Sequence, residues 1–146
     1  GIYHQAGPIV LQAKDLGLQV PFMSGDGTRE QPFLDVAKDA AEGTYLTFGP
    51  DPLATQQGRG FAYKYKERYR VEAGAYSTYA HDAAQVLLRA IEKVGTDDLG
   101  RLCDAVRASD YTGLNGLELR FDAKGDIAGS FYVMWRVKDG RFQVIQ

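Results

Sequence analysis

Cysteine is nearly absent from this sequence of 146 residues, which contains only Cys103. A single cysteine cannot form a disulfide within the chain, so cysteine content leaves the redox compartment open. Histidine is almost as scarce, and His4 and His81 stand far apart. Because His4 has no second histidine, cysteine or carboxylate at the spacing of metal ligands, we expect no metal site.

The sequence also has no large excess of positive or negative charge. Seventeen Lys and Arg residues oppose nineteen Asp and Glu residues, the net charge is -2, and no segment gathers five or more basic residues. This balance argues against a nucleic-acid partner.

No apolar run approaches the roughly 18 to 20 residues that span a bilayer, and the sequence does not open with a basic and then an apolar segment. We expect no membrane span, and we expect any targeting signal to have been removed or to lie outside this sequence.

The first 48 residues show the periodicity of an α/β unit, in which apolar residues alternate in strands and recur every three or four positions in helices. They predict a helix over 7–16, a strand over 18–23, a helix over 32–42 and a strand over 44–48. The segment 49–52, Gly-Pro-Asp-Pro, ends the last strand with a rigid connection.

The second part of the chain changes to helical periodicity, with helices predicted over 56–69, 77–94 and 99–108. The helix over 77–94 is expected to present a wide apolar face to another element, made of Ala80, Ala83, Ala84, Leu87, Leu88, Ile91 and Val94. Two hairpin turns are predicted at 124–126 and 138–140. The order of elements indicates an α/β fold with mixed strands, although two early strands are few for a complete doubly wound sheet.

Two short motifs that could bind a ligand are incomplete. The segment Gly25-Asp26-Gly27 lacks both the longer glycine pattern of a dinucleotide site and the Lys-Ser/Thr ending of a phosphate loop. The segment 122–126 resembles the opening of a calcium loop, but Lys124 occupies its middle and no glutamate follows at the required position. We therefore predict a polar turn there and no nucleotide site.

His81 and Asp82 could suggest a catalytic base with its orienting carboxylate. Because they are adjacent on a predicted helix, we expect them to point in different directions and assign His81 a structural role. No set of nucleophile, base and oxyanion donors is found. We predict a protein that is not an enzyme and uses no cofactor.

Five segments carry a resemblance to a known family. In order they are GIYHQAG at 1–7, VPFMSGDG at 20–27, DAAEG at 39–43, GAYSTYAHDA at 74–83 and FDAKGD at 121–126. Together they resemble the C-terminal part of the leucine/isoleucine/valine-binding proteins of bacterial ABC importers, which have the type I periplasmic binding fold. The similarity covers essentially the whole chain.

The resemblance implies two Rossmann-like lobes that trap a small molecule in the cleft between them. Residues 1–48 would form part of the C-terminal lobe, residues 49–117 helices of the N-terminal lobe, and residues 118–146 a crossing segment with the terminal strands of the C-terminal lobe. Such proteins are about twice this length or longer, so most of the N-terminal lobe would be lacking here. A periplasmic, that is extracytoplasmic, location and a membrane permease partner are implied as well.

The loop 24–27 is the first candidate for a ligand contact. Asp26 follows a predicted strand at its carboxyl end, where ligands bind in open α/β sheets, and the flanking Gly25 and Gly27 allow close approach. A carboxylate there could hold an ammonium group, although Asp26 could instead cap a turn or the next helix. The resemblance implies that Asp26, with Gly25, contacts the ammonium group of an amino acid.

Aromatic and apolar residues complete the predicted site. Tyr76 precedes the long helix, where its ring could cover the apolar side chain of the ligand or could simply pack in the interior. The resemblance implies that Tyr76 lines the cleft from the N-terminal lobe. Ile2 stands where family members often have an aromatic residue, with Tyr3 beside it. This departure leaves the ligand open among amino acids, amides, urea-like compounds and aromatic acids.

Three alternatives remain open: an amino-acid receptor for transport, a sensory ligand-binding domain of the same fold for amides or aromatic acids, and an oligomeric fragment without ligand binding. The last follows from apolar helix residues that a missing sheet would normally cover, namely Phe61, Tyr65, Leu87, Leu88, Ile91 and Leu102. Such a surface exceeds what a soluble monomer usually exposes. We therefore expect the isolated chain to form a homodimer or higher oligomer.

Overall fold

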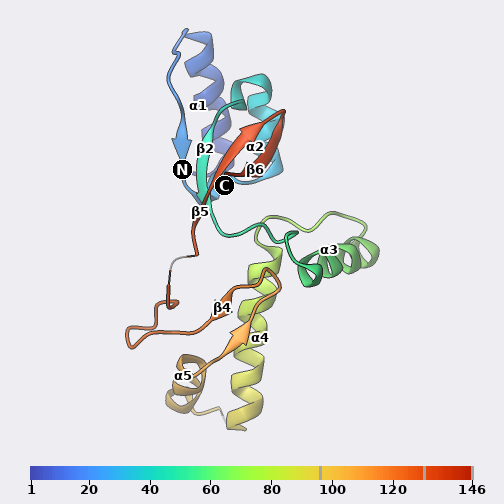
Figure 1. Cartoon of the computed structure of the whole chain (residues 1–146), viewed down its shortest axis with the longest axis vertical. Coiled ribbons are helices and arrows are strands. Elements are labelled where there is room, and N and C mark those ends of the chain that lie inside the picture. The colour runs from blue at the N-terminus through green and yellow to red at the C-terminus, as the bar shows by residue number, and fades with distance from the viewer. Residues whose placement is uncertain (96, 130, 146) are drawn as a thin grey trace. The chain divides into compact units, whose positions relative to one another are not determined.

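The chain folds into two compact units in a computed structural model that describes residues 1–95, 97–129 and 131–145. The sheet unit comprises Gly1–Pro50 with Tyr132–Gln146, and the helical unit comprises Asp51–Phe131. Figure 1 shows the elements of both units in chain order. The sheet unit is therefore discontinuous in sequence, whereas the helical unit is one uninterrupted segment.

The sheet unit contains a four-stranded mixed sheet in the order β1-β2-β5-β6. Strand β1 pairs with β2 in parallel, and the pairs β2–β5 and β5–β6 are antiparallel. Leu46 of β2 lies opposite Trp135 of β5, and Phe48 lies opposite Val133. The elements of this unit are α1 (Tyr3–Asp15), β1 (Met23–Ser24), the 3-10 helix η1 (Asp26–Thr28), α2 (Gln31–Ala37), the 3-10 helix η2 (Lys38–Ala41), β2 (Tyr45–Phe48), β5 (Val133–Lys138) and β6 (Arg141–Val144).

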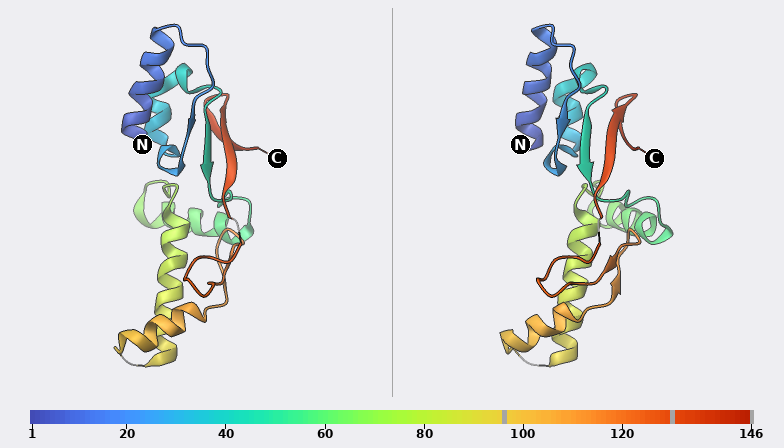
Figure 2. Two further views of the ribbon diagram at one scale, coloured as in Figure 1. Left: turned by 90° about the vertical axis from the view of Figure 1, so that its left-hand side faces the viewer. Right: turned by 60° about the vertical axis from the view of Figure 1, so that its left-hand side comes forward.

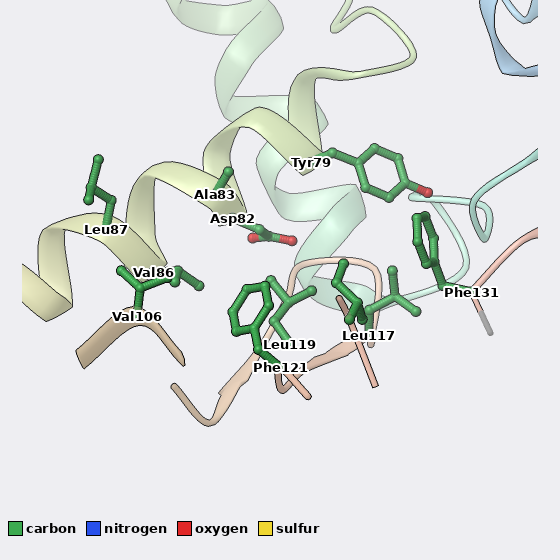
Figure 3. A pocket seen from close by; sticks show the side chains of 11 residues that line it. Tyr79, Asp82, Ala83, Val86, Leu87, Val106, Leu117, Leu119, Phe121 and Phe131 are labelled. Atoms are coloured by element: carbon green, nitrogen blue, oxygen red, sulfur yellow. The ribbon is translucent and has the colours of Figure 1, made fainter. Parts of the chain in front are cut away.

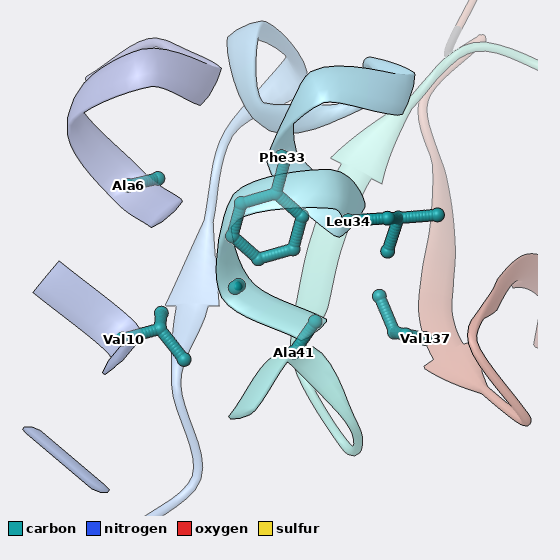
Figure 4. Packing of buried hydrophobic residues seen from close by; sticks show 7 residues of the cluster. Ala6, Val10, Phe33, Leu34, Ala41 and Val137 are labelled. Carbon is teal, nitrogen blue, oxygen red and sulfur yellow. The ribbon is translucent and has the colours of Figure 1, made fainter. Parts of the chain in front are cut away.

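Helices α1 and α2 cover one face of this sheet (Figure 2). Alternation along β2 and β5 places Leu46, Phe48, Trp135 and Val137 on that face, where each is 2% exposed or less. The core cluster contains Ala6, Val10, Phe33, Leu34, Ala37, Ala41 and Val137 (Figure 4). Gly7 lets the helices meet closely, because a Cβ at this position would lie 2.9 Å from Cγ1 of Val36 on α2.

The helical unit consists of three helices and a short hairpin. They are α3 (Gln56–Tyr69), α4 (Ser77–Val94), α5 (Leu99–Arg107) and the antiparallel strands β3 (Tyr111–Thr112) and β4 (Glu118–Leu119). Side chains cap two of the helices: Thr55 Oγ1 accepts the N–H of Gly58 at 2.9 Å, and Asp98 Oδ1 accepts the N–H of Arg101 at 2.9 Å. Gly95 ends α4 in the left-handed conformation, with φ 63°.

Asp82 on α4 organises the loop between β3 and β4. Its carboxylate is buried and accepts hydrogen bonds from the N–H of Leu114 at 2.8 Å and the hydroxyl of Tyr111 at 3.3 Å. His81 Nδ1 lies 3.1 Å from Asp82 Oδ1, so the expectation that these adjacent side chains point apart was wrong. Gly113 is required beside this carboxylate, since a Cβ there would approach Asp82 Oδ2 to 2.4 Å.

The buried face of α4 differs from its most apolar face. Its buried residues are Thr78, Asp82, Val86 and Ala90, spaced four apart. The apolar residues that a sheet outside this chain was expected to cover are exposed, with Leu87, Leu88 and Ile91 at 50%, 57% and 43%. Hydrophobic periodicity does not identify the buried face, because it assigns the carboxylate of Asp82 to the solvent.

Several helices and strands begin and end at the predicted residues or within one residue of them, whereas others differ more. The predicted bounds of α3 and α4 are confirmed, and α5 and β2 differ from them by a single residue. Helix α1 starts at Tyr3 and continues through Pro8, with Gln5 Oε1 accepting the N–H of Ile2 at 3.4 Å. Strand β1 is reduced to Met23–Ser24, since Pro21 has no N–H to donate to a ladder.

Both predicted turns are present. Asp139 and Gly140 have positive φ and join β5 to β6, as a tight antiparallel hairpin requires. In the other turn, Asp122 Oδ1 accepts the N–H groups of Lys124 at 2.8 Å and Asp126 at 3.0 Å. This second turn is therefore a polar Asx-type turn flanked by the bridge between Phe121 and Ile127.

Candidate ligand-binding site

The loop after β1 is held in one conformation by its own hydrogen bonds. The N–H of Thr28 donates to the carbonyl of Gly25 at 3.3 Å, and the N–H of Arg29 donates to the carbonyl of Asp26 at 2.9 Å. The hydroxyl oxygens of Ser24 and Thr28 lie 2.6 Å apart, and Thr28 is fully buried. This bond links the last residue of β1 to the last residue of η1, so Asp26 projects from a short, closed turn.

The start of α1 lies against this turn. A Cβ placed on Gly27 would lie 3.0 Å from the carbonyl oxygen of Gly1 and 3.0 Å from Cγ2 of Ile2. The structure therefore places Ile2 against Gly27, in the turn that also contains Gly25 and Asp26 after β1. The side chain of Ile2 is 46% exposed, and Gly25 and Asp26 are exposed as well.

Tyr3 follows Ile2 and is the first residue of α1, and its predicted contact with the ligand stays a prediction. Its side chain is half-buried and packs against the core cluster of the sheet unit. The ring meets the ring of His4 edge-on, with 5.4 Å between centroids. Tyr3 therefore fixes the first turn of α1 on the sheet unit, and through it the position of Ile2.

Tyr76 belongs to the helical unit, whereas Asp26 belongs to the sheet unit. Tyr76 is the N-cap residue of α4, its side chain is 41% exposed, and Ala75 before it is buried. An exposed ring held at a helix start offers apolar area with few rotatable bonds. In this chain the ring is not buried, and its contact with a ligand stays a prediction.

Sequence reasoning overlooked Arg29, the residue that follows η1. Its guanidinium carbon lies 4.1 Å from the ring centroid of Trp135, 5.0 Å from that of Phe48 and 5.7 Å from that of Phe142. The sequence contains a single tryptophan, and nothing in local spacing connects it to Arg29. The pairing is visible only once β5 lies beside β2.

The helical unit carries a separate apolar groove with a volume of about 430 Å³ (Figure 3). Figure 3 shows side chains from α4 on one side and from the segment after β3 on the other. Its lining is Tyr79, Asp82, Ala83, Val86, Leu87, Val106, Leu117, Leu119, Phe121, Ile127 and Phe131. Because the carboxylate of Asp82 is engaged with Leu114, Tyr111 and His81, the groove offers mainly apolar contacts.

The surroundings of Tyr111, in the helical unit, shift its pKa. Burial, together with the neighbouring Asp82 carboxylate, raises the pKa of Tyr111 above its usual value of 10.0.

Over residues 1–95, 97–129 and 131–145, no group of three or more His, Cys, Asp or Glu side chains could hold a metal ion. None of the described helices combines the length and apolar character that crossing a membrane requires.

Comparison with known proteins gives consistent matches. Residues 4–141 match the family described as periplasmic binding protein. The chain is 34% identical over 149 residues to Leu/Ile/Val-binding protein homolog 2 of Brucella abortus, an alignment that spans 100% of this chain and 40% of the relative. The chain thus spans less than half the length of this relative.

Solved structures agree with the sequence match. A leucine-binding protein from Thermotoga maritima superimposes with a TM-score of 0.86 at 30% identity, over 100% of this chain and 42% of the other. An ABC transporter substrate-binding protein from Desulfitobacterium hafniense, solved in complex with leucine, gives 0.73 at 26% identity, over 94% and 39%. With its mixed α/β architecture and these matches, the chain belongs to the periplasmic binding protein family and forms part of a type I periplasmic binding fold.

Proposed function

We propose that the complete protein containing this chain captures a free branched-chain amino acid outside the cytoplasm and presents it to the membrane permease of an ABC importer. The observation that carries this proposal is the exposed Asp26 carboxylate on a closed turn at the carboxyl end of β1. The Leu/Ile/Val-binding protein homolog of Brucella, the leucine-binding protein of Thermotoga and the leucine complex of the Desulfitobacterium protein support an amino acid as the ligand.

In this proposal Asp26 accepts charge-assisted hydrogen bonds from the ammonium group of the ligand. The bond between Ser24 and Thr28 reduces the entropy lost on binding, because the turn is already ordered. Ile2 and Gly25 border the ammonium end, and Tyr76 covers the apolar side chain once the two lobes close. The protein performs no chemical step on the ligand.

We assign the sheet unit to the C-terminal lobe and the helical unit to the N-terminal lobe of the complete protein. The boundaries expected from sequence, after residues 48 and 117, remain a prediction, whereas the units of the structure change at Pro50 and again at Tyr132. Ligand binding would favour the closed arrangement of the lobes, because only that arrangement contacts the ligand from both sides.

Calorimetry with the complete protein and its Asp26→Ala variant tests the ammonium contact. Loss of a charged hydrogen bond should weaken leucine binding by about 1.5 to 3 kcal/mol or more. Asp39→Ala is the matched control, since Asp39 is also an exposed carboxylate in a 3-10 helix of the sheet unit. Unchanged affinity in Asp26→Ala, or an equal loss in Asp39→Ala, would refute the role of Asp26.

A further inference from the structure

Arg29 lies among three aromatic rings that belong to three different strands of the sheet. Trp135 of β5 and Phe48 of β2 are each 2% exposed, and Phe142 of β6 is half-buried. Arg29 is half-buried, and its guanidinium carbon lies 4.1, 5.0 and 5.7 Å from these ring centroids, within the range of cation–π attraction. We refer to Arg29, Phe48, Trp135 and Phe142 as the arginine stack.

The backbone of Arg29 connects this stack to the turn that carries Asp26. Its N–H donates to the carbonyl of Asp26 at 2.9 Å, which closes η1. Thr28, the preceding residue, is fully buried and bonded to Ser24. The backbone of Arg29 is therefore bonded directly to the turn that carries Asp26.

Trp135 connects the same stack to the segment where the chain leaves the sheet unit. Its indole Nε1–H donates to the carbonyl of Gly49 at 3.0 Å in a buried hydrogen bond. Gly49 precedes Pro50, the last residue of the first segment of this unit. The return segment enters at Tyr132, beside Val133, which is the register partner of Phe48. The two connections to the helical unit therefore start from adjacent strand ends, and the stack contains a residue from each of these strands.

We propose that Arg29 is a positioning residue that couples the Asp26 turn to both connecting segments through Trp135. A ligand that displaces Asp26 then changes the preferred position of Gly49 and of the start of β5. Conversely, a displacement of these connecting segments when the lobes close changes the preferred position of the Asp26 turn. The coupling itself needs no ligand, whereas its role in amino-acid binding rests on the proposed function. Because Lys lacks the planar guanidinium, this role is specific to arginine.

Amide hydrogen exchange on this chain tests the coupling without any ligand. In Arg29→Met, which keeps an unbranched but shorter side chain and removes its cation, exchange should accelerate about tenfold both in residues 24–29 and in residues 47–51. Val10→Ala, in the core cluster but outside the stack, is the control for a general loss of stability. Acceleration confined to residues 24–29, or the same pattern in Val10→Ala, would overturn the proposal.

A double-mutant cycle with Trp135→Phe separates coupling from two independent effects. If Arg29 acts through Trp135, the double variant exchanges no faster in residues 47–51 than the faster of the two single variants, whereas additive effects would contradict the coupling. Where Arg29→Met unfolds the sheet unit, Arg29→Lys provides the same measurement with a smaller perturbation.

Leucine affinity of the complete protein then tests the functional consequence. Arg29→Met should weaken binding about tenfold, and a Val10→Ala variant of matched thermal stability should not. Equal affinities in Arg29→Met and the original protein would show that the stack does not position the ligand turn. If the original protein binds no amino acid, the proposed function fails, and the exchange measurement still decides whether the coupling exists.

Discussion

Asp26 and Tyr76 contribute different physical quantities to the proposed site, charge in one case and apolar area in the other. Asp26 could be proposed from sequence because a carboxylate between glycines after a strand is a local pattern. Arg29 could not, because its ring partners come from strands that meet it only through the sheet register. Sequence therefore suggests candidates with local signatures and leaves out residues that act through long-range stacking.

Tyr76 is expected to set selectivity for the side chain of the ligand. In the complete protein, Tyr76→Ala should weaken leucine binding about tenfold and alanine binding far less, because the lost ring area matters only to a large apolar side chain. Calorimetry with both amino acids measures the difference. Tyr63→Ala removes a more exposed tyrosine of the helical unit, 68% against 41%, and serves as the control. Equal losses for leucine and alanine would exclude this role.

Because of Tyr111, the stability of the helical unit is expected to depend on pH in the alkaline range. Its pKa is raised in the folded state, mainly by burial and further by Asp82, so its contribution to stability is complete below the unfolded value and is lost as pH rises through the folded value. The free energy of unfolding should therefore fall more steeply above pH 10 in the original chain than in Tyr111→Phe. Denaturant titrations of both proteins at neutral and alkaline pH measure this, and parallel curves would contradict it.

At the scale of elements, helix α4 shows what periodicity can and cannot establish. Its bounds, Ser77–Val94, were predictable because apolar residues recur at helical spacing and Gly95 ends the helix. Its buried face was not, because Asp82 faces inward. Hydrogen bonds from Leu114 and Tyr111 compensate the burial of this carboxylate, and both donors lie far along the chain.

The hydrogen bonds of Asp82 should stabilise the helical unit more than those of exposed carboxylates do. Asp82→Ala leaves the N–H of Leu114 without this acceptor and should lower the free energy of unfolding by about 3 kcal/mol. Chemical denaturation checks the value. Asp104→Ala on α5, whose side chain is 80% exposed beside Arg107, should cost less than about 1 kcal/mol. Similar effects of the two substitutions would show that Asp82 has no organising role.

At the scale of the whole molecule, apolar side chains of α4 determine the expected state of the isolated chain. Leu87, Leu88 and Ile91 together expose a stripe on one helix, whereas Phe61 and Tyr65 of α3 are half-buried and in ring contact with each other at 5.8 Å. The predicted apolar surface is therefore narrower than sequence suggested, and it is centred on α4. Self-association of the chain remains a prediction.

We expect the isolated chain to form a homodimer or higher oligomer through this stripe, and to bind free leucine weakly or not at all. Light scattering at micromolar concentration should report a mass above that of one chain, and Leu88→Glu should return it toward the monomer, because a charge in an apolar contact is costly. Leu16→Glu, at an exposed leucine of the sheet unit, is the control. A monomeric original chain, or tight leucine binding by it, would contradict this expectation.

The discontinuity of the sheet unit also determines the order in which the chain can fold during synthesis. The helical unit, Asp51–Phe131, is one continuous segment, so all of it leaves the ribosome before β5 does. Strand β2 must wait, because its neighbour β5 is made only after the entire helical unit. Until then Leu46 and Phe48 lack the strand beside them, and the nascent chain carries an open sheet edge that a chaperone or a second copy could occupy.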